Sequence, residues 1–162
     1  MRWRRVEGDV LGLGWKESSA AETPSATHLG ALLMDSQVEW VGGQKLTCTG
    51  KDGVVMELGW GGEVVNPVMA TLHSCGACSL IDVVEGLKNR EVTRAVVELD
   101  LERAENNPRV FTKIHMIYRV EGVDLPEKLI RRLIEKSHAK YCTVSNMLKH
   151  TADITWDLVM DG

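Results

Sequence analysis

Apolar and polar positions alternate in short runs along much of the chain from residue 37 onward. Glycine pairs and Asp-Gly turns separate the first three runs, which is typical of hairpins in an antiparallel meander. Two later runs, at residues 93–102 and 110–120, are longer than the first three, and the turn between them contains Asn106-Asn107-Pro108. Strands are therefore expected at 38–41, 45–49, 54–58, 93–102, 110–120 and 154–159.

Between the third and fourth expected strands, the pattern changes to a helical one over residues 66–87. Asn66 is a good N-cap, and Pro67 stands at the first helical position, where its missing N–H costs nothing. Small residues occupy the other faces, and no charged residue occurs before Asp82. We expect a central helix that shelters any thiol on it. The expected apolar stripe consists of Val68, Met69, Leu72, Leu80, Val83, Val84 and Leu87.

A second amphipathic helix is expected to begin at Pro126 and to end near Cys142. Its apolar side is formed by Leu129, Ile130, Leu133 and Ile134. A short helical segment over 143–149 and the last strand follow. Strands and helices do not alternate regularly in this order, so the pattern predicts an α+β fold with a largely antiparallel sheet.

Residues 1–36 lack sustained periodicity and are predicted to be a flexible N-terminal extension to a domain over 37–162. Met34, followed by Asp35 and Ser36, precedes the first strand-like run. This suggests the hypothesis that the native chain starts at Met34, which N-terminal sequencing of the native protein would test.

Length and charge narrow the range of functions. The chain has 162 residues, enough for one domain, and a net charge of −4 with scattered Lys and Arg. We therefore expect no nucleic-acid or membrane partner, and no apolar run reaches the ~20 residues of a membrane span. Four cysteines without a signal-peptide pattern favour reduced thiols in the cytoplasm.

The cysteines carry the candidate chemistry. Cys75 and Cys78 form a CxxC, which fits a dithiol redox pair, half of a zinc site, or two buried thiols one turn apart. The pair lies about two turns inside the helix, which disfavours a thioredoxin-like site, since there the motif opens the helix. A zinc site would need Cys142 together with His73 or His138.

The other two cysteines differ in their surroundings. Cys48 is expected to be a small buried hydrophobe in its strand. Cys142 lies at the start of a short helix, where a thiol is favourably placed to become a thiolate.

Two motifs resemble those of the OsmC/Ohr superfamily. The first is Asn66-Pro67 with the small-residue helix that leads to Cys78-Ser79-Leu80-Ile81-Asp82-Val83. The second is Tyr141-Cys142-Thr143-Val144-Ser145, followed by Met147-Leu148. The resemblance extends over residues 37–159. Segments 108–112 and 135–142 further resemble a branch usually described simply as OsmC family proteins.

The resemblance implies a fold and an activity. Family members of known activity are thiol peroxidases that reduce organic hydroperoxides and hydrogen peroxide, and they form intertwined homodimers with sheets around central helices. It implies that Cys78 is the peroxidatic thiol and Cys142 the resolving thiol, without a metal or organic cofactor. A disulfide formed between them would be reduced by an external dithiol.

The sequence also departs from the better-known peroxidases. Val68 stands where they have a Glu, and no Arg occurs between Arg5 and Arg90 to form the activating pair. Lys45, Lys51 or Lys140 could supply a positive charge instead, and Cys75 could compete with Cys142 as the resolving thiol. The alternative function is that of a non-catalytic protein that binds a small apolar ligand and keeps its cysteines as structural residues.

Overall fold

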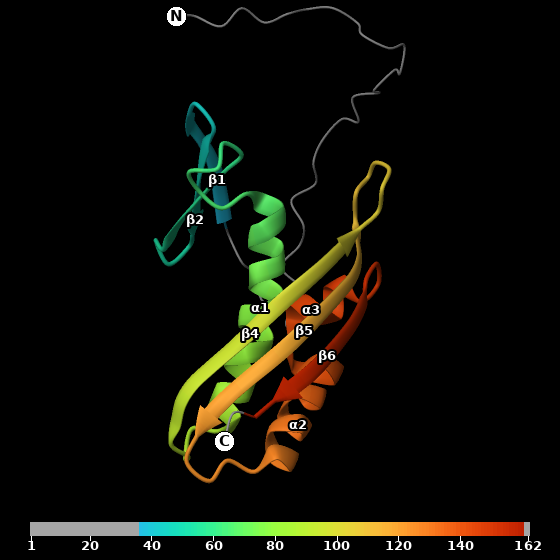
Figure 1. Cartoon of the computed structure of the whole chain (residues 1–162). Helices are drawn as coiled ribbons and strands as arrows, with labels where there is room; N and C mark the ends of the chain where they lie inside the picture. Colours follow the sequence, from blue (N-terminus) through green and yellow to red (C-terminus); the bar gives the residue numbers. More distant parts are fainter. Residues whose placement is uncertain (1–35, 161–162) are drawn as a thin grey trace, which may run out of the picture. The chain divides into compact units, whose positions relative to one another are not determined.

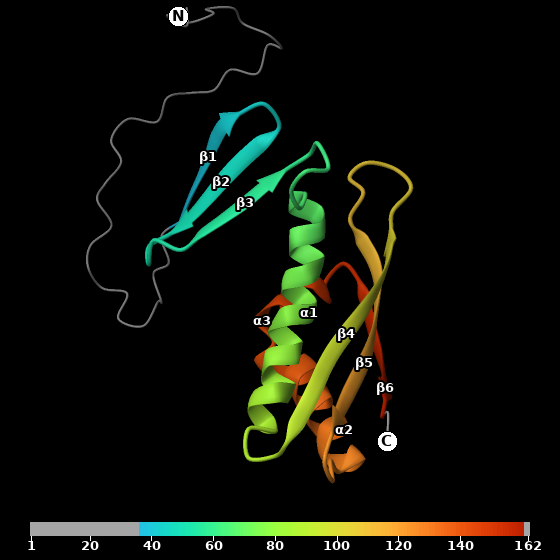
Figure 2. The same cartoon turned by 60° about the vertical axis from the view of Figure 1, so that its left-hand side comes forward.

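The computed structural model describes residues 36–160, and Figures 1 and 2 show the arrangement of its elements. The predicted N-terminal extension and the start at Met34 lie outside these residues. The helices and strands are, in order, β1 (Ser36–Gly42), β2 (Lys45–Gly50), β3 (Val55–Gly59), α1 (Pro67–Gly86), β4 (Val92–Arg103), β5 (Phe111–Gly122), α2 (Glu127–Lys136), a π-helix (Ser137–Tyr141), α3 (Thr143–Leu148) and β6 (Asp153–Val159).

The first sheet is the predicted meander, with the order β1-β2-β3 and antiparallel pairing throughout. Gly42 and Gly43 form the first turn with φ angles of 108° and 55°, which glycine adopts most readily. Cys48 lies between Val38 and Met56 in the register, and both of these neighbours are exposed. The expectation that Cys48 is buried is therefore wrong: its side chain is partly exposed.

The second sheet has the order β4-β5-β6. The predicted hairpin of β4 and β5 is antiparallel, whereas β6 runs parallel to β5, from Lys113 opposite Asp153 to Arg119 opposite Val159. The parallel pairing arises because α2, the π-helix and α3 form the crossover between the two strands. The α+β class is confirmed, but its strands form two sheets within residues 36–160 rather than one.

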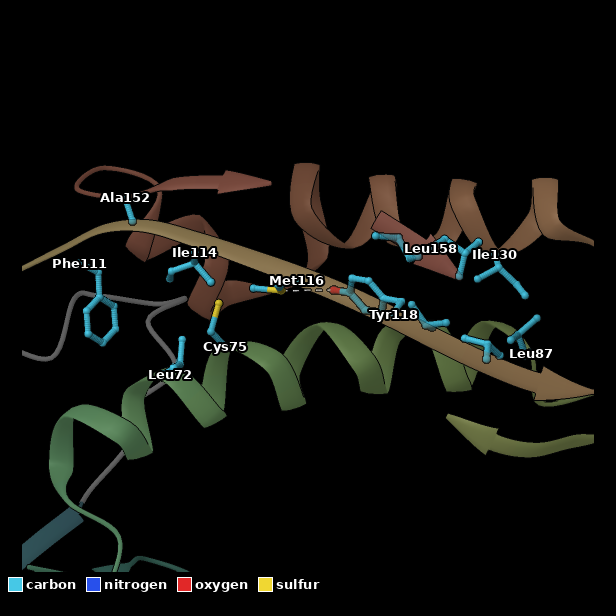
Figure 3. Packing of buried hydrophobic residues seen from close by; sticks show 13 residues of the cluster. Leu72, Cys75, Leu87, Phe111, Ile114, Met116, Tyr118, Ile130, Ala152 and Leu158 are labelled. Carbon is cyan, nitrogen blue, oxygen red and sulfur yellow. Dashed lines mark hydrogen bonds between the residues drawn. The ribbon is translucent and has the colours of Figure 1, made fainter. Parts of the chain in front are cut away.

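Helix α1 packs against β4 and α2. It packs tightly on the sheet at Gly76, where an added Cβ would lie 2.8 Å from Leu99 Cδ1 and 3.2 Å from Val97 Cγ1. Figure 3 shows the core between α1, β5 and the crossover helices. The core residues drawn and labelled there are Leu72, Cys75, Leu87, Phe111, Ile114, Met116, Tyr118, Ile130, Ala152 and Leu158.

Only one side of α1 is buried by its own chain. Leu72, Cys75, Gly76, Ser79 and Val83 are buried, whereas Val68, Ile81 and Val84 are exposed. Two members of the expected apolar stripe, Val68 and Val84, are therefore exposed in the single chain. By length and hydropathy alone, α1 could cross a membrane, but here it packs as a core helix against a sheet and a second helix.

Candidate active site

Helix α1 holds two of the thiols one turn apart. The predicted cap is confirmed, since Asn66 Oδ1 accepts a hydrogen bond of 2.9 Å from the Met69 amide. Cys75 and Cys78 are three residues apart and therefore share a face of the helix. Cys75 is completely buried, whereas Cys78 is partly exposed. The two thiols of the CxxC therefore differ in how easily a small molecule reaches them.

The π-helix Ser137–Tyr141 brings the third thiol to α1. The sequence predicts a continuous α-helix to this point, but α2 ends at Lys136 and the wider turn follows. Ser137 is buried, and its hydroxyl donates a hydrogen bond of 2.6 Å to Asp82 Oδ2 on α1. The Cys142 amide donates to the Ser137 carbonyl at 2.8 Å. These bonds connect Cys142, through Ser137, to the helix that carries Cys75 and Cys78.

Cys142 is the N-cap of α3, as its position in the sequence predicts. Its sulfur accepts a hydrogen bond of 3.3 Å from the Ser145 amide and lies 3.9 Å from the Cys75 carbonyl oxygen. The thiols of Cys75 and Cys78 act on this sulfur as hydrogen-bond donors that lower its pKa. The structure therefore assembles a cluster of three free thiols, Cys75, Cys78 and Cys142, which we call the thiol cluster.

Hydrogen bonds to Cys142 determine which thiol of the cluster ionises first. The bond from Cys75, followed by those from Ser145 and Cys78, lowers the pKa of Cys142 to about 5 despite its burial. The pKa of Cys75, in contrast, is raised by its hydrogen bond to Cys142 and by its own burial. Burial raises the pKa of Cys78, while the Val144 and Thr143 amides partly offset the rise. At neutral pH the charge of the cluster therefore resides on Cys142.

A buried polar chain lies beside the thiol cluster. Tyr118 Oη lies 2.6 Å from Ser79 Oγ and 2.9 Å from His138 Nε2. Burial lowers the pKa of His138, and the negative charge of Cys142 acts against this effect. Burial also raises the pKa of Tyr118. Sequence reasoning did not find this chain, although a Ser and a Tyr within otherwise apolar buried faces were a usable signal.

The structure places His73 away from the thiol cluster and gives Lys45 and Lys140 other partners. His73 is exposed on α1, away from the buried face that carries Cys75. Within residues 36–160, no three side chains of His, Cys, Asp or Glu are arranged to hold a metal ion. Lys45 makes an ion pair of 2.9 Å with Glu63, and the Lys140 ammonium lies 5.4 Å from the centre of the Tyr141 ring.

Comparison with known proteins gives the family. A model of OsmC-like proteins matches residues 61–157, from the loop before α1 into β6. The chain belongs to the OsmC-like protein family. It is 35% identical over 128 residues to protein YhfA of Escherichia coli, and the aligned region covers 75% of this chain and 94% of YhfA.

Solved structures support the OsmC-like fold. A hypothetical protein from Aquifex aeolicus is 25% identical, with a TM-score of 0.70 over 82% of this chain and all of its own. An organic hydroperoxide resistance protein from Elizabethkingia anophelis has a TM-score of 0.59 over 81% of this chain and 98% of its own. At 15% identity, the second likeness concerns the fold alone. The match of the OsmC-like family model, together with this fold, confirms the resemblance to the OsmC/Ohr superfamily.

Proposed function

We propose that this OsmC-like protein is a thiol peroxidase that reduces organic hydroperoxides or hydrogen peroxide. The observation that carries the proposal is the thiol cluster: a partly exposed Cys78 acts on a buried Cys142 whose pKa is lowered to about 5. A peroxide can approach Cys78, whereas Cys142 is completely buried. Family membership and the hydroperoxide resistance protein of the same fold add support.

The Cys142 thiolate takes the place of the missing Glu/Arg pair in the proposed reaction. The Cys78 thiol passes its proton to Cys142 while its sulfur attacks the terminal peroxide oxygen. The O–O bond breaks, Cys78 becomes a sulfenic acid, and the alkoxide takes the proton from Cys142 and leaves as an alcohol. A base in direct contact with the nucleophile thereby compensates for the burial that raises the pKa of Cys78.

Resolution then uses the same two sulfurs. The regenerated Cys142 thiolate attacks the Cys78 sulfur, an S–S bond forms, and the S–O bond breaks. The hydroxide that leaves takes up a proton to form water. An external dithiol returns both cysteines to the reduced state by disulfide exchange. The cycle requires no metal or organic cofactor, and we place it in the reducing cytoplasm.

We further propose that the protein acts as a homodimer. Ala77, Leu80, Ile81 and Val84 line an apolar hollow on the exposed side of α1. A second copy would cover this surface, which does not include Cys78 itself. Members of the superfamily are typically dimeric, which supports this arrangement.

Peroxide consumption by the reduced protein tests the proposed activity. Reduced wild-type protein is mixed with cumene hydroperoxide or hydrogen peroxide, and the remaining peroxide is measured. Cys78→Ser should abolish consumption. Cys142→Ser should consume peroxide more slowly, because it lacks the base, and should stop at a sulfenic acid that dimedone traps on Cys78. Cys48→Ser is the matched control and should behave as wild type. Unchanged consumption by Cys78→Ser would refute the proposal.

A second candidate function is the binding of a small apolar ligand. It is favoured by a hollow of about 250 Å³ between β3 and α1, lined mainly by apolar side chains. Met56, Leu58, Val65, Ala70 and Ala77 provide these, together with His73 and Ser74. Two results would favour this function instead. The cysteines would not react with peroxide, and the protein would bind a hydrophobic fluorescent probe stoichiometrically, with the binding blocked by Ala70→Trp.

A further inference from the structure

The proposed peroxidase cycle uses Cys78 and Cys142 and leaves Cys75 without a role. Cys75 is completely buried on α1, and it makes a hydrogen bond to the same Cys142 sulfur as Cys78 does. Its carbonyl oxygen lies 3.9 Å from that sulfur. Cys142 is therefore the sulfur shared by two thiols, one buried and one partly exposed.

We propose that Cys75 takes over the disulfide from Cys78, so that oxidation of the protein ends in a buried Cys75–Cys142 disulfide and a free Cys78 thiol. This inference rests on the proposed function, because the peroxide reaction at Cys78 is what first oxidises the protein. It makes Cys75 a third redox cysteine, whose role is to store that equivalent inside the fold.

The exchange balances without another reactant. The Cys75 sulfur attacks the Cys142 sulfur of the Cys78–Cys142 disulfide, the new S–S bond forms, and the old one breaks. Cys78 leaves as a thiolate and takes up the proton that Cys75 loses. One disulfide and one thiol are present before and after, and the oxidation level of the protein is unchanged.

The surroundings favour this direction. In the reduced protein, Cys75 is held protonated chiefly by its bond to the Cys142 thiolate. Oxidation of Cys142 removes that charge and so removes the largest cause of the raised pKa. The leaving Cys78 sulfur, in turn, receives hydrogen bonds from the Val144 and Thr143 amides of α3, which stabilise it as a thiolate.

The exchange has two consequences. Cys78 becomes free to react with a second hydroperoxide, more slowly than with the first because Cys142 no longer serves as its base, while the first oxidising equivalent stays in the protein. The new disulfide joins two sulfurs that are both completely buried in the reduced structure, so an external dithiol reaches it more slowly than a disulfide at Cys78. The oxidised protein therefore persists longer when Cys75 is present.

Locating the disulfide tests the inference directly. Reduced wild-type protein is treated with a single equivalent of cumene hydroperoxide, and free thiols are blocked with iodoacetamide. The disulfide is then reduced and its cysteines are labelled with N-ethylmaleimide. Trypsin places Cys75 and Cys78 together on peptide 52–88 and Cys142 on peptide 141–149, so tandem mass spectrometry must locate the label within the first peptide. We expect it on Cys75 and Cys142.

Cys75→Ser separates the exchange from the first step, because the hydroxyl keeps a hydrogen-bond donor toward Cys142. With excess peroxide, wild type should consume twice as much per chain as Cys75→Ser and should form a dimedone adduct on Cys78, which the variant lacks. Cys75→Ala should give the same difference, and Cys48→Ser should match wild type. A Cys78–Cys142 disulfide as the end product in wild type would overturn the inference and leave the peroxidase proposal intact.

Oxidation by diamide, which forms disulfides without a peroxide, separates the two proposals further. If no peroxide is consumed, the peroxidase proposal fails. Accumulation of the Cys75–Cys142 disulfide after diamide would still support the exchange, whereas a stable Cys78–Cys142 or Cys75–Cys78 disulfide would overturn it.

Discussion

At the scale of single residues, the position of each sulfur relative to backbone amides matters more than its position in the sequence. Cys142 begins α3 and accepts the Ser145 amide, whereas Cys75 and Cys78 lie within α1 and donate toward Cys142. Three chemically identical side chains thereby become one acid of low pKa and two hydrogen-bond donors.

The first prediction concerns the pH dependence of Cys142. Its pKa of about 5 lies below the ordinary value of 9.0, so the thiolate stabilises the fold above pH 9 and this contribution is lost as the pH falls toward 5. Ultraviolet thiolate absorption of the reduced protein should show one titration near pH 5, with peroxide consumption falling below it. Cys142→Ser should remove both the titration and the stability change. A first titration in the ordinary thiol range would contradict the assignment.

The second prediction concerns the buried polar chain. Tyr118→Phe removes the hydroxyl between Ser79 and His138 and leaves the buried His138 Nε2 without this partner. We expect a loss of about 1–3 kcal/mol in the free energy of unfolding, measured by urea denaturation. Tyr141→Phe is the matched control, since Tyr141 is exposed, and it should change stability by less than about 0.5 kcal/mol. Equal effects would show that the hydrogen bonds contribute nothing.

At the scale of elements, the π-helix positions the thiol cluster. It consists of the five residues between α2 and Cys142, and a hydrogen bond from Ser137 to Asp82 connects it to α1. Such wide turns are frequent at functional sites because they redirect the residues that follow.

The third prediction tests this connection. Ser137→Ala removes the 2.6 Å bond to Asp82 from a fully buried position. We expect a loss of stability of about 1–3 kcal/mol, together with a rise in the pKa of Cys142 as its approach to the α1 thiols loosens. Ser74→Ala, which loses an exposed bond to the Ala70 carbonyl, is the control. If Cys142 in Ser137→Ala still titrates near pH 5, the bond between Ser137 and Asp82 does not position Cys142 against the α1 thiols.

Local patterns predicted most of these elements and missed the π-helix. Asn66, Pro67 and the Asp-Gly turn act through neighbours in the sequence, so their structural effects could be inferred from it. The π-helix depends on Ser137 reaching Asp82, 55 residues away, and the meeting of Cys75 with Cys142 depends on tertiary packing. The resemblance implied roles for Cys78 and Cys142, and the place of Cys142 at the start of a helix indicated a thiolate there, but neither showed that the thiols of α1 meet it.

At the scale of the whole molecule, the exposed apolar side of α1 calls for a partner. The fourth prediction is that Ile81→Lys, at a side chain 61% exposed, converts a dimer to a monomer, because it places a charge on the surface that the second copy would bury. Sedimentation measures the change. Val123→Lys, at the exposed apolar residue after β5, should leave the dimer intact. A wild-type monomer would refute the proposed assembly.

Cys142 follows Cys75 by 67 residues in the chain, and the fold brings its sulfur to 3.9 Å from the Cys75 carbonyl oxygen. A disulfide here would close a long loop and restrict the unfolded chain, which raises the free energy of unfolding by about 4 kcal/mol. The fifth prediction is that the oxidised protein withstands a protease longer than the reduced one, measured as cleavage half-life with and without dithiothreitol. In a cell, exposure to oxidants would then lengthen the lifetime of this protein, and its abundance would keep a record of past oxidative stress.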